Sequence, residues 1–127
     1  MTLRCVLVDD SPPVLRSARE LLEGQGIAVV AVAETAEAAV RLTAELEPDV
    51  TLVDIDLGPE SGFDLCRRLV EAVAGAGTRI ILMSTHNGAD FANLIEASPA
   101  IGFLPKSDLS ATAIRRLLAG GHDDGRD

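Results

Sequence analysis

Several short apolar segments of this 127-residue sequence end in acidic, hydroxyl or lysine side chains. Each side chain comes at the carboxyl end of its segment, which is where open sheets of parallel strands bind their ligands. If the segments are parallel strands, these side chains therefore meet at one edge of a sheet. In chain order they are Asp9 and Asp10, Asp54 and Asp56, Ser84 and Thr85, and Lys106.

The charges of this group indicate the chemistry that it supports. Two like charges about 4 Å apart repel by roughly 4 kcal/mol at an effective dielectric constant near 20, so clustered carboxylates require a cation. Donors that are all oxygen suit Mg²⁺ rather than zinc. With a divalent ion and Lys106 to balance the charge, the Asp54 carboxylate is suited to attack a phosphoryl group.

Strand-like and helix-like segments alternate five times along the chain. Strands are predicted at residues 3–8, 27–33, 50–54, 79–83 and 102–104. After the first strand, a helix with Ser11 as its N-cap stops at Gly24, and further helices are predicted at 36–46, 62–74, 89–97 and 109–119. The strands are apolar on both faces, so this order predicts a doubly wound parallel α/β sheet with helices on both sides.

Helical periodicity also predicts which side chains face the sheet. The residues expected to be buried are Val14, Ala18, Leu21 and Leu22 in the first helix, Leu65, Leu69 and Val73 in the third, Phe91, Leu94 and Ile95 in the fourth, and Ile114, Leu117 and Leu118 in the last.

Composition excludes several classes of protein. The net charge of −9 argues against a surface for nucleic acid or anionic membranes. The longest apolar run, residues 27–33, is far shorter than the roughly 20 residues of a membrane-spanning helix, and residues 1–10 do not resemble a signal peptide. Cys5 and Cys66 are interpreted as reduced core residues. We therefore expect a cytoplasmic protein whose residues 1–120 form one domain, followed by a flexible tail or linker stub at 121–127.

The order of the chemical groups resembles the receiver domain of bacterial two-component response regulators. The likeness spans about residues 3–119, and the string GFLPKSDLS is closest to receivers of LuxR-type regulators. The positions that carry it are Asp9, Asp10, Asp54, Ser84 and Lys106, with Gly62 and Phe103 in support.

This resemblance implies a flavodoxin-like (βα)₅ sheet of strand order 2-1-3-4-5. It also implies Mg²⁺-dependent phosphorylation of Asp54 by a sensor histidine kinase or a small phosphodonor. Asp10 and Asp54 would bind the ion directly, Asp9 largely through water, and Asp56 through its main-chain carbonyl. Two further roles are implied at the phosphate, a hydrogen bond from Ser84 and an ion pair with Lys106.

The resemblance further implies a switch. Ser84 moves towards the phosphate, Phe103 turns inward, and the surface formed by residues 89–97, 102–104 and 109–119 changes. A downstream effector or an output domain outside this chain reads that surface, which is also where a homodimer is expected. Such a protein takes part in its own phosphorylation and dephosphorylation but does not turn over as an enzyme.

Some positions depart from the family pattern. Ser107 follows Lys106 and Pro105 precedes it, whereas the family often has proline directly after the lysine. Asp56 and Thr85 are the positions where we expect tuning of rates, and Thr85 is expected to slow both phosphorylation and hydrolysis. Neither His86 nor His122 is expected to be catalytic. Whether the domain works alone or was excised from a longer regulator stays open.

Three other classes of protein compete with this interpretation. The string TLVDIDLG resembles the first motif of haloacid-dehalogenase-type phosphatases, with Asp54 as nucleophile and Asp56 as acid, but there the acidic pair comes last in the chain. A receiver-like interaction module that is not phosphorylated would carry the same fold. A nucleotide or flavin binder lacks support, because no glycine-rich loop follows the first strand.

Overall fold

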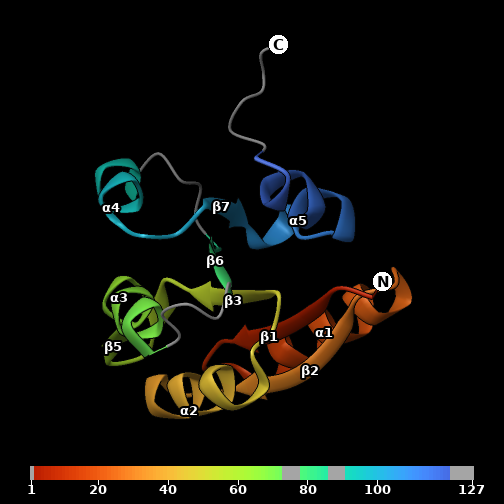
Figure 1. The fold of residues 1–127 in the computed structure, drawn as a ribbon, viewed down its shortest axis with the longest axis horizontal. Coiled ribbons are helices and arrows are strands. Elements are labelled where there is room, and N and C mark those ends of the chain that lie inside the picture. The colour runs from red at the N-terminus through yellow and green to blue at the C-terminus, as the bar shows by residue number, and fades with distance from the viewer. Residues whose placement is uncertain (1, 73–77, 86–90, 121–127) are drawn as a thin grey trace.

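A computed structural model describes residues 2–72, 78–85 and 91–120 of the chain. Five parallel strands form one sheet in the order β2-β1-β3-β6-β7 (Figure 1). This order matches the 2-1-3-4-5 arrangement of a flavodoxin-like fold, so the fold prediction is confirmed. The strands are β1 (Arg4–Val8), β2 (Ala28–Ala33), β3 (Val50–Asp54), β6 (Arg79–Ser84) and β7 (Gly102–Pro105).

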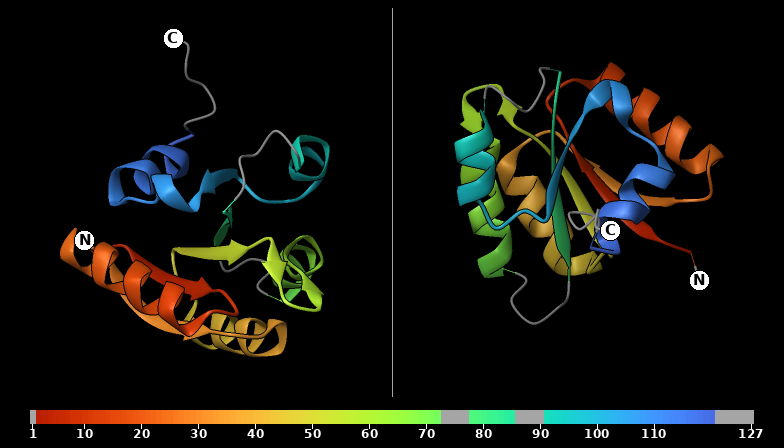
Figure 2. Two further views of the ribbon diagram at one scale, coloured as in Figure 1. Left: turned by 180° about the vertical axis from the view of Figure 1, so that it is seen from behind. Right: turned by 90° about the horizontal axis from the view of Figure 1, so that it is seen from above.

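Helices cover both faces of the sheet (Figures 1 and 2). One apolar cluster packs α1 (Pro12–Gly24) and α5 (Ala111–Leu118) against strand residues such as Leu7 and Leu52. The other packs α2 (Ala36–Leu46), α3 (Gly62–Ala72) and the partly buried residues of α4 (Ala92–Ala97) against residues such as Val53 and Leu82. Successive strand residues thus point into opposite clusters, which explains why the strands are apolar throughout.

The buried face of α1 is rotated about the helix axis from the predicted face. Leu15 and Leu22 are buried, whereas Leu21 is 41% exposed and Val14 and Ala18 are only partly buried. Leu15, Ala18 and Leu22 form an apolar stripe at i, i+3 and i+7. Judged by its sequence, this stripe is as suitable for packing on the sheet as the predicted one.

The ends of α1 agree with the prediction. Ser11 is the N-cap residue but makes no side-chain capping bond, and Gly24 is the last residue of the helix. The turn that follows uses Gly26, whose φ is +92°. The helix therefore stops at Gly24 as predicted, and the left-handed backbone that the following turn needs falls on Gly26.

The last helix is shorter than expected, and one side chain of α4 differs from its predicted burial. Leu94 is 54% exposed on α4, while Phe91 and Ile95 pack against the core. The last helix begins at Ala111 because residues Lys106–Asp108 form a 3₁₀ turn, η2, and the Ser110 hydroxyl accepts a bond from the Ala113 N–H. Ile114 is buried as predicted, and Leu117 and Leu118 are partly buried.

Some predictions fall outside the described residues, namely Val73, the start of the fourth helix at 89, His86, His122 and the tail at 121–127. Leu65 and Leu69 are buried on α3 as predicted.

Both cysteines are free and buried. Burial raises the pKa of Cys5 to about 12 and that of Cys66 to about 11, as expected of unreactive core thiols. Within the described parts of the chain, none of the helices combines the length and apolarity needed to cross a membrane.

A small antiparallel hairpin, which the sequence analysis did not predict, follows β3. It pairs β4 (Asp56–Leu57) with β5 (Glu60–Ser61) and leads into α3. The N–H of Gly62 donates to the carbonyl of Ile55 over 2.8 Å. A Cβ at Gly62 would overlap the carbonyl oxygen of Asp54 and lie 2.7 Å from Cα of Ile55, so only glycine allows this close return of the chain.

We predict that Gly62→Ala lowers the free energy of unfolding by about 2 kcal/mol or more, because the backbone of β3 must shift to admit a methyl group. Gly24→Ala is the matched control, since nothing lies within 4 Å of the added methyl. It should be neutral or stabilise α1 by up to about 1 kcal/mol. Urea unfolding followed by circular dichroism measures both. Equal effects of the two substitutions would contradict the steric argument.

Candidate functional site

Three carboxylates meet at the carboxyl edge of the sheet. Asp9 and Asp10 directly follow β1, and Asp54 is the last residue of the neighbouring strand β3. One carboxylate oxygen from each lies within 4.8 Å of the others, and we call these three residues the acidic cluster. Asp9 is 1% and Asp54 4% exposed, whereas Asp10 is exposed, so the cluster opens to solvent on one side.

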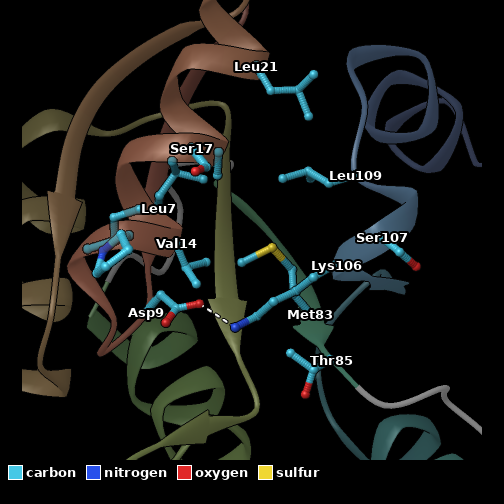
Figure 3. Close-up of a pocket in the computed structure, with 13 residues that line it drawn as sticks. Leu7, Asp9, Val14, Ser17, Leu21, Met83, Thr85, Lys106, Ser107 and Leu109 are labelled. Carbon is cyan, nitrogen blue, oxygen red and sulfur yellow. Dashed lines mark hydrogen bonds and ion pairs between the residues drawn. The ribbon is translucent and has the colours of Figure 1, made fainter.

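Lys106 reaches the acidic cluster from β7, the outermost strand on one side of the sheet. It directly follows β7, and its Nζ lies 2.5 Å from Oδ2 of Asp9 and 3.3 Å from Oδ2 of Asp54 (Figure 3 shows the contact with Asp9). Its side chain is only 17% exposed. A single ammonium group therefore bridges the two buried acids, and it lies closer to Asp9.

Backbone donors hold the other oxygen of each buried acid. The N–H of Asp56 donates to Oδ1 of Asp54 over 3.1 Å. In the same way, the N–H of Ser11 donates to Oδ1 of Asp9 over 3.0 Å. Each bond spans two residues, a local turn that aspartate forms readily. Both side chains are thus held on one side by their own loop and on the other by Lys106.

The ionisation of the site follows from this arrangement. Burial, and then the charge of Asp9, raise the pKa of Asp54 to about 6, although the Asp56 N–H and Lys106 act in the opposite direction. Burial alone would lower the pKa of Lys106, but its bond to Asp9 and the charges of Asp54 and Asp9 raise it above the ordinary value. At neutral pH Lys106 is cationic and Asp54 is ionised.

The acidic cluster fits a small divalent cation. Three carboxylates with one ammonium leave an excess of negative charge at a partly buried edge, which favours binding of a cation. Oxygen ligands of Mg²⁺ lie about 2.1 Å from the ion, so ligands on its opposite sides are roughly 4 Å apart. The spacing within the acidic cluster is compatible with that requirement. The side chain of Asp56 is exposed and is not part of the cluster. The role predicted for its main-chain carbonyl stays a prediction.

The remaining predicted residues lie around this edge. Ser84 is fully buried at the end of β6, in register with Pro105, which directly precedes Lys106. Thr85 is exposed next to it. Phe103 on β7 is partly buried and packs on the cluster that includes Ile80 and Leu82. The structure thus brings these strand ends together, while the roles predicted for the three residues stay predictions.

An apolar groove of about 470 Å³ opens beside the Lys106–Asp9 pair (Figure 3). It runs between α1 and the segment that joins β7 to α5, and Thr85 lies at its lower end in this view. Leu21, exposed on α1, faces Leu109 across it. The further lining includes Val14, Ala18, Met83 and Ser107.

Two features near the site were not predicted. Gly58, at the tip of the β4–β5 hairpin, has φ of +63°, and a Cβ there would lie 3.1 Å from Oδ2 of Asp10. Glu60 in β5 accepts a hydrogen bond from the backbone of α2. The Gly-Pro dipeptide in DIDLGPES is a turn signal that could have revealed the hairpin, but no local pattern indicates the partner of Glu60.

Comparison with known proteins agrees with this fold. A two-component response regulator of the LuxR family from Aurantimonas sp. SI85-9A1 superposes with a TM-score of 0.83 at 34% identity, over 94% of this chain and 87% of that one. Response regulator GacA of Pseudomonas aeruginosa is 27% identical over 91% of this chain and 55% of its own length. The protein-glutamate methylesterase/protein-glutamine glutaminase of Idiomarina loihiensis is 37% identical over 84% of this chain and 28% of its own.

A doubly wound sheet of this strand order, with acids and a lysine at its carboxyl edge, defines a flavodoxin-like protein. Residues 5–117 match the response regulator receiver domain, and the chain belongs to that family. The predicted resemblance is therefore confirmed, and the phosphatase alternative is set aside. The chain spans little more than half of the length of GacA and less than a third of the length of the methylesterase.

Because the pKa of Asp54 is raised, we predict that removing its charge stabilises the fold in a pH-dependent way. The unfolded chain releases this proton near pH 4 and the folded protein near pH 6, so ionisation opposes folding once the pH exceeds about 4, and fully above about 6. Asp54→Asn should raise the free energy of unfolding at pH 7 by roughly 1–2 kcal/mol, and this gain should fade between about pH 6 and pH 4. Urea unfolding at several pH values measures it.

Glu71→Gln on the exposed surface of α3 is the control for this measurement, because it removes one charge away from the site. It should change stability by less than about 0.5 kcal/mol. An Asp54→Asn variant that is less stable than the wild type at pH 7 would contradict the charge argument, as would a gain that does not depend on pH.

Proposed function

We propose that Asp54 is the phosphoacceptor of this receiver domain and that the acidic cluster binds the Mg²⁺ ion that the transfer requires. The observation that carries this proposal is the position of the Asp54 carboxylate beside those of Asp9 and Asp10, with its Oδ2 3.3 Å from Nζ of Lys106. It is nearly buried, yet it adjoins an exposed acid, Asp10, from the side where a donor can approach. Family membership supports the proposal.

The transfer uses one oxygen of Asp54 as the nucleophile. This oxygen forms a new bond to phosphorus, the bond from phosphorus to the donor breaks, and the leaving group keeps that electron pair. Asp10 and Asp54 would hold the ion directly, Asp9 largely through water and Asp56 through its carbonyl. When bound, Mg²⁺ neutralises charge on the phosphoryl oxygens.

Lys106 supplies the second positive charge. It starts in contact with Asp9 and Asp54 and pairs with the phosphoryl oxygens once the acceptor is modified. The Ser84 hydroxyl donates a hydrogen bond to the same group. In hydrolysis, a water oxygen bonds to phosphorus, the bond from phosphorus to the Asp54 oxygen breaks, and inorganic phosphate leaves while Asp54 keeps the electron pair as a free carboxylate. The protein is therefore a temporary acceptor that catalyses its own modification and its reversal, rather than an enzyme that turns over a separate substrate.

The donor in the cell is a sensor histidine kinase, and the site of the reaction is the cytoplasm. The apolar groove between α1 and η2 suits a donor protein, because it adjoins Lys106 and presents the exposed Leu21. With a net charge of −9, the chain itself does not bind nucleic acid. A downstream effector, or an output domain attached to the receiver, reads the result.

Phosphorylation switches the surface formed by α4, β7 and α5. Ser84 and Pro105 are neighbours across β6 and β7, so a shift of Ser84 towards the phosphate displaces the strand that carries Phe103. Phe103 is only partly buried, so an inward turn would bury more of its ring. The same surface is the place for a homodimer. The phosphate biases the equilibrium by its differential contacts in the two states.

Incubation of the protein with Mg²⁺ and acetyl phosphate tests the proposal. We expect intact-mass analysis to show the addition of one labile phosphoryl group, lost in Asp54→Asn and in wild-type protein treated with a chelator. Lys106→Met should slow the transfer about 100-fold or more, because a charge on the phosphoryl oxygens is no longer balanced. The conservative control is Arg116→Met on the exposed face of α5, which should transfer at the wild-type rate.

A stable phosphoryl group on Asp54→Asn, or transfer that proceeds equally without a divalent ion, would contradict the proposal. Steady release of phosphate from a generic monoester, without accumulation of the modified protein, would support a phosphatase instead.

Thr85 should limit access to the acceptor. Its side chain is exposed beside Ser84, next to the groove that contains Lys106. We expect Thr85→Ala to raise both the rate of phosphorylation by acetyl phosphate and the rate of dephosphorylation, with Thr85→Ser in between. Loss of the phosphoryl group followed by mass spectrometry measures the second rate. Unchanged rates in Thr85→Ala would rule out this role.

A further inference from the structure

One side chain attaches the β4–β5 hairpin to the N-terminus of α2. Oε1 of Glu60 accepts a hydrogen bond of 2.9 Å from the N–H of Ala36, the first residue of that helix. The first N–H groups of a helix lack acceptors within it, and a carboxylate there also interacts favourably with the helix dipole. The Thr35 hydroxyl accepts from the Ala38 N–H, so the two side chains serve different donors.

The same hairpin contacts two residues of the acidic cluster. Its first N–H, from Asp56, donates to Oδ1 of Asp54. Its tip lies against Asp10, since a Cβ on Gly58 would be 3.1 Å from Oδ2 of that residue. The position of the hairpin therefore affects the positions of the Asp54 and Asp10 carboxylates.

The N-terminus of α2 lies close to the third residue of the acidic cluster. α2 follows β2 after two residues, and Ala33, which ends β2, accepts a hydrogen bond of 3.0 Å from the N–H of Asp9. The bond from Glu60 to Ala36 thus links the segment that holds Asp54 and Asp10 to the corner of the sheet that holds Asp9.

We propose that Glu60 is a positioning residue for the metal site, which holds the hairpin against the acidic cluster by binding the N-terminus of α2. This inference rests on the proposed function, because it concerns the affinity of that site for Mg²⁺. Groups that orient metal ligands typically contribute about 10- to 100-fold in affinity. Glu60 acts through the backbone rather than on a ligand atom, so its effect lies at or below the lower end of that range.

Titration of the full chain with Mg²⁺ by isothermal calorimetry tests this role. For Glu60→Ala we expect the Kd for Mg²⁺ to rise about fivefold to tenfold. Glu60→Gln removes the charge but keeps a carbonyl oxygen as acceptor, so its Kd should stay within about twofold of the wild type. Glu60 is exposed, and neither substitution disturbs the core.

Glu37→Ala is the matched control, because it removes an exposed carboxylate from the first turn of the same helix. Its Kd should equal that of the wild type. A second readout is amide hydrogen exchange by NMR, in which Ala36, Asp56 and Gly62 should exchange faster in Glu60→Ala than in Glu37→Ala. This measurement reports on the hairpin directly and does not require bound metal.

Three results would overturn the inference: a wild-type Kd and unchanged exchange in Glu60→Ala, equal weakening by Glu60→Gln and Glu60→Ala, or equal weakening by Glu37→Ala. The last two would indicate a general effect of charge. A wild-type protein that binds no Mg²⁺ would instead contradict the proposed function itself, whereas normal binding by both wild type and Glu60→Ala contradicts only the role of Glu60.

Discussion

The contact of one ammonium group with two buried carboxylates is the interaction on which the site depends. Without Lys106, the negative charges of Asp9 and Asp54 would face each other at an edge that water reaches poorly, where like charges repel by several kcal/mol. Lys106 balances part of this charge but leaves the pKa of Asp54 raised. The site is therefore electrostatically unfavourable in the folded protein, and a divalent cation bound there would relieve this residual repulsion. A region that is poorly stabilised in isolation is a common property of functional sites.

The fold makes this contact possible by bringing distant residues to one edge. Parallel strands all point their carboxyl ends the same way, so the residues at or just after the ends of β1, β3, β6 and β7 become neighbours although they lie far apart in the sequence. The two apolar clusters on opposite faces hold the strands rigidly from both sides. Close packing extends to the loops, since Gly62 admits no side chain against the backbone of Asp54. Asp54 thus stands on a closely packed support, while the exposed residues around it, such as Asp10 and Thr85, remain accessible.

The sequence predicted the features that depend on periodicity and on strand ends. Strands that are apolar on both faces identified the sheet, and the residues after them identified Asp9, Asp54 and Lys106 as neighbours. It could not choose between Leu15 and Leu21 as the buried residue of α1, because two stripes of that helix are almost equally apolar. The hairpin strands of two residues each are too short to show an alternating pattern. The bond from Glu60 to Ala36 joins residues 24 apart in sequence and depends on how the hairpin packs, so only the folded chain reveals it.

A crystal structure with Mg²⁺ and beryllofluoride, a stable mimic of a phosphoryl group, would show whether Asp54 accepts the group and whether Lys106 follows it. We expect beryllium bonded to a carboxylate oxygen of Asp54, the metal ion among the three acids, and the Nζ of Lys106 moved from Asp9 to a fluoride. Beryllofluoride on any other residue would contradict it. So would a complex in which Lys106 keeps its contact with Asp9 and makes none with the fluorides.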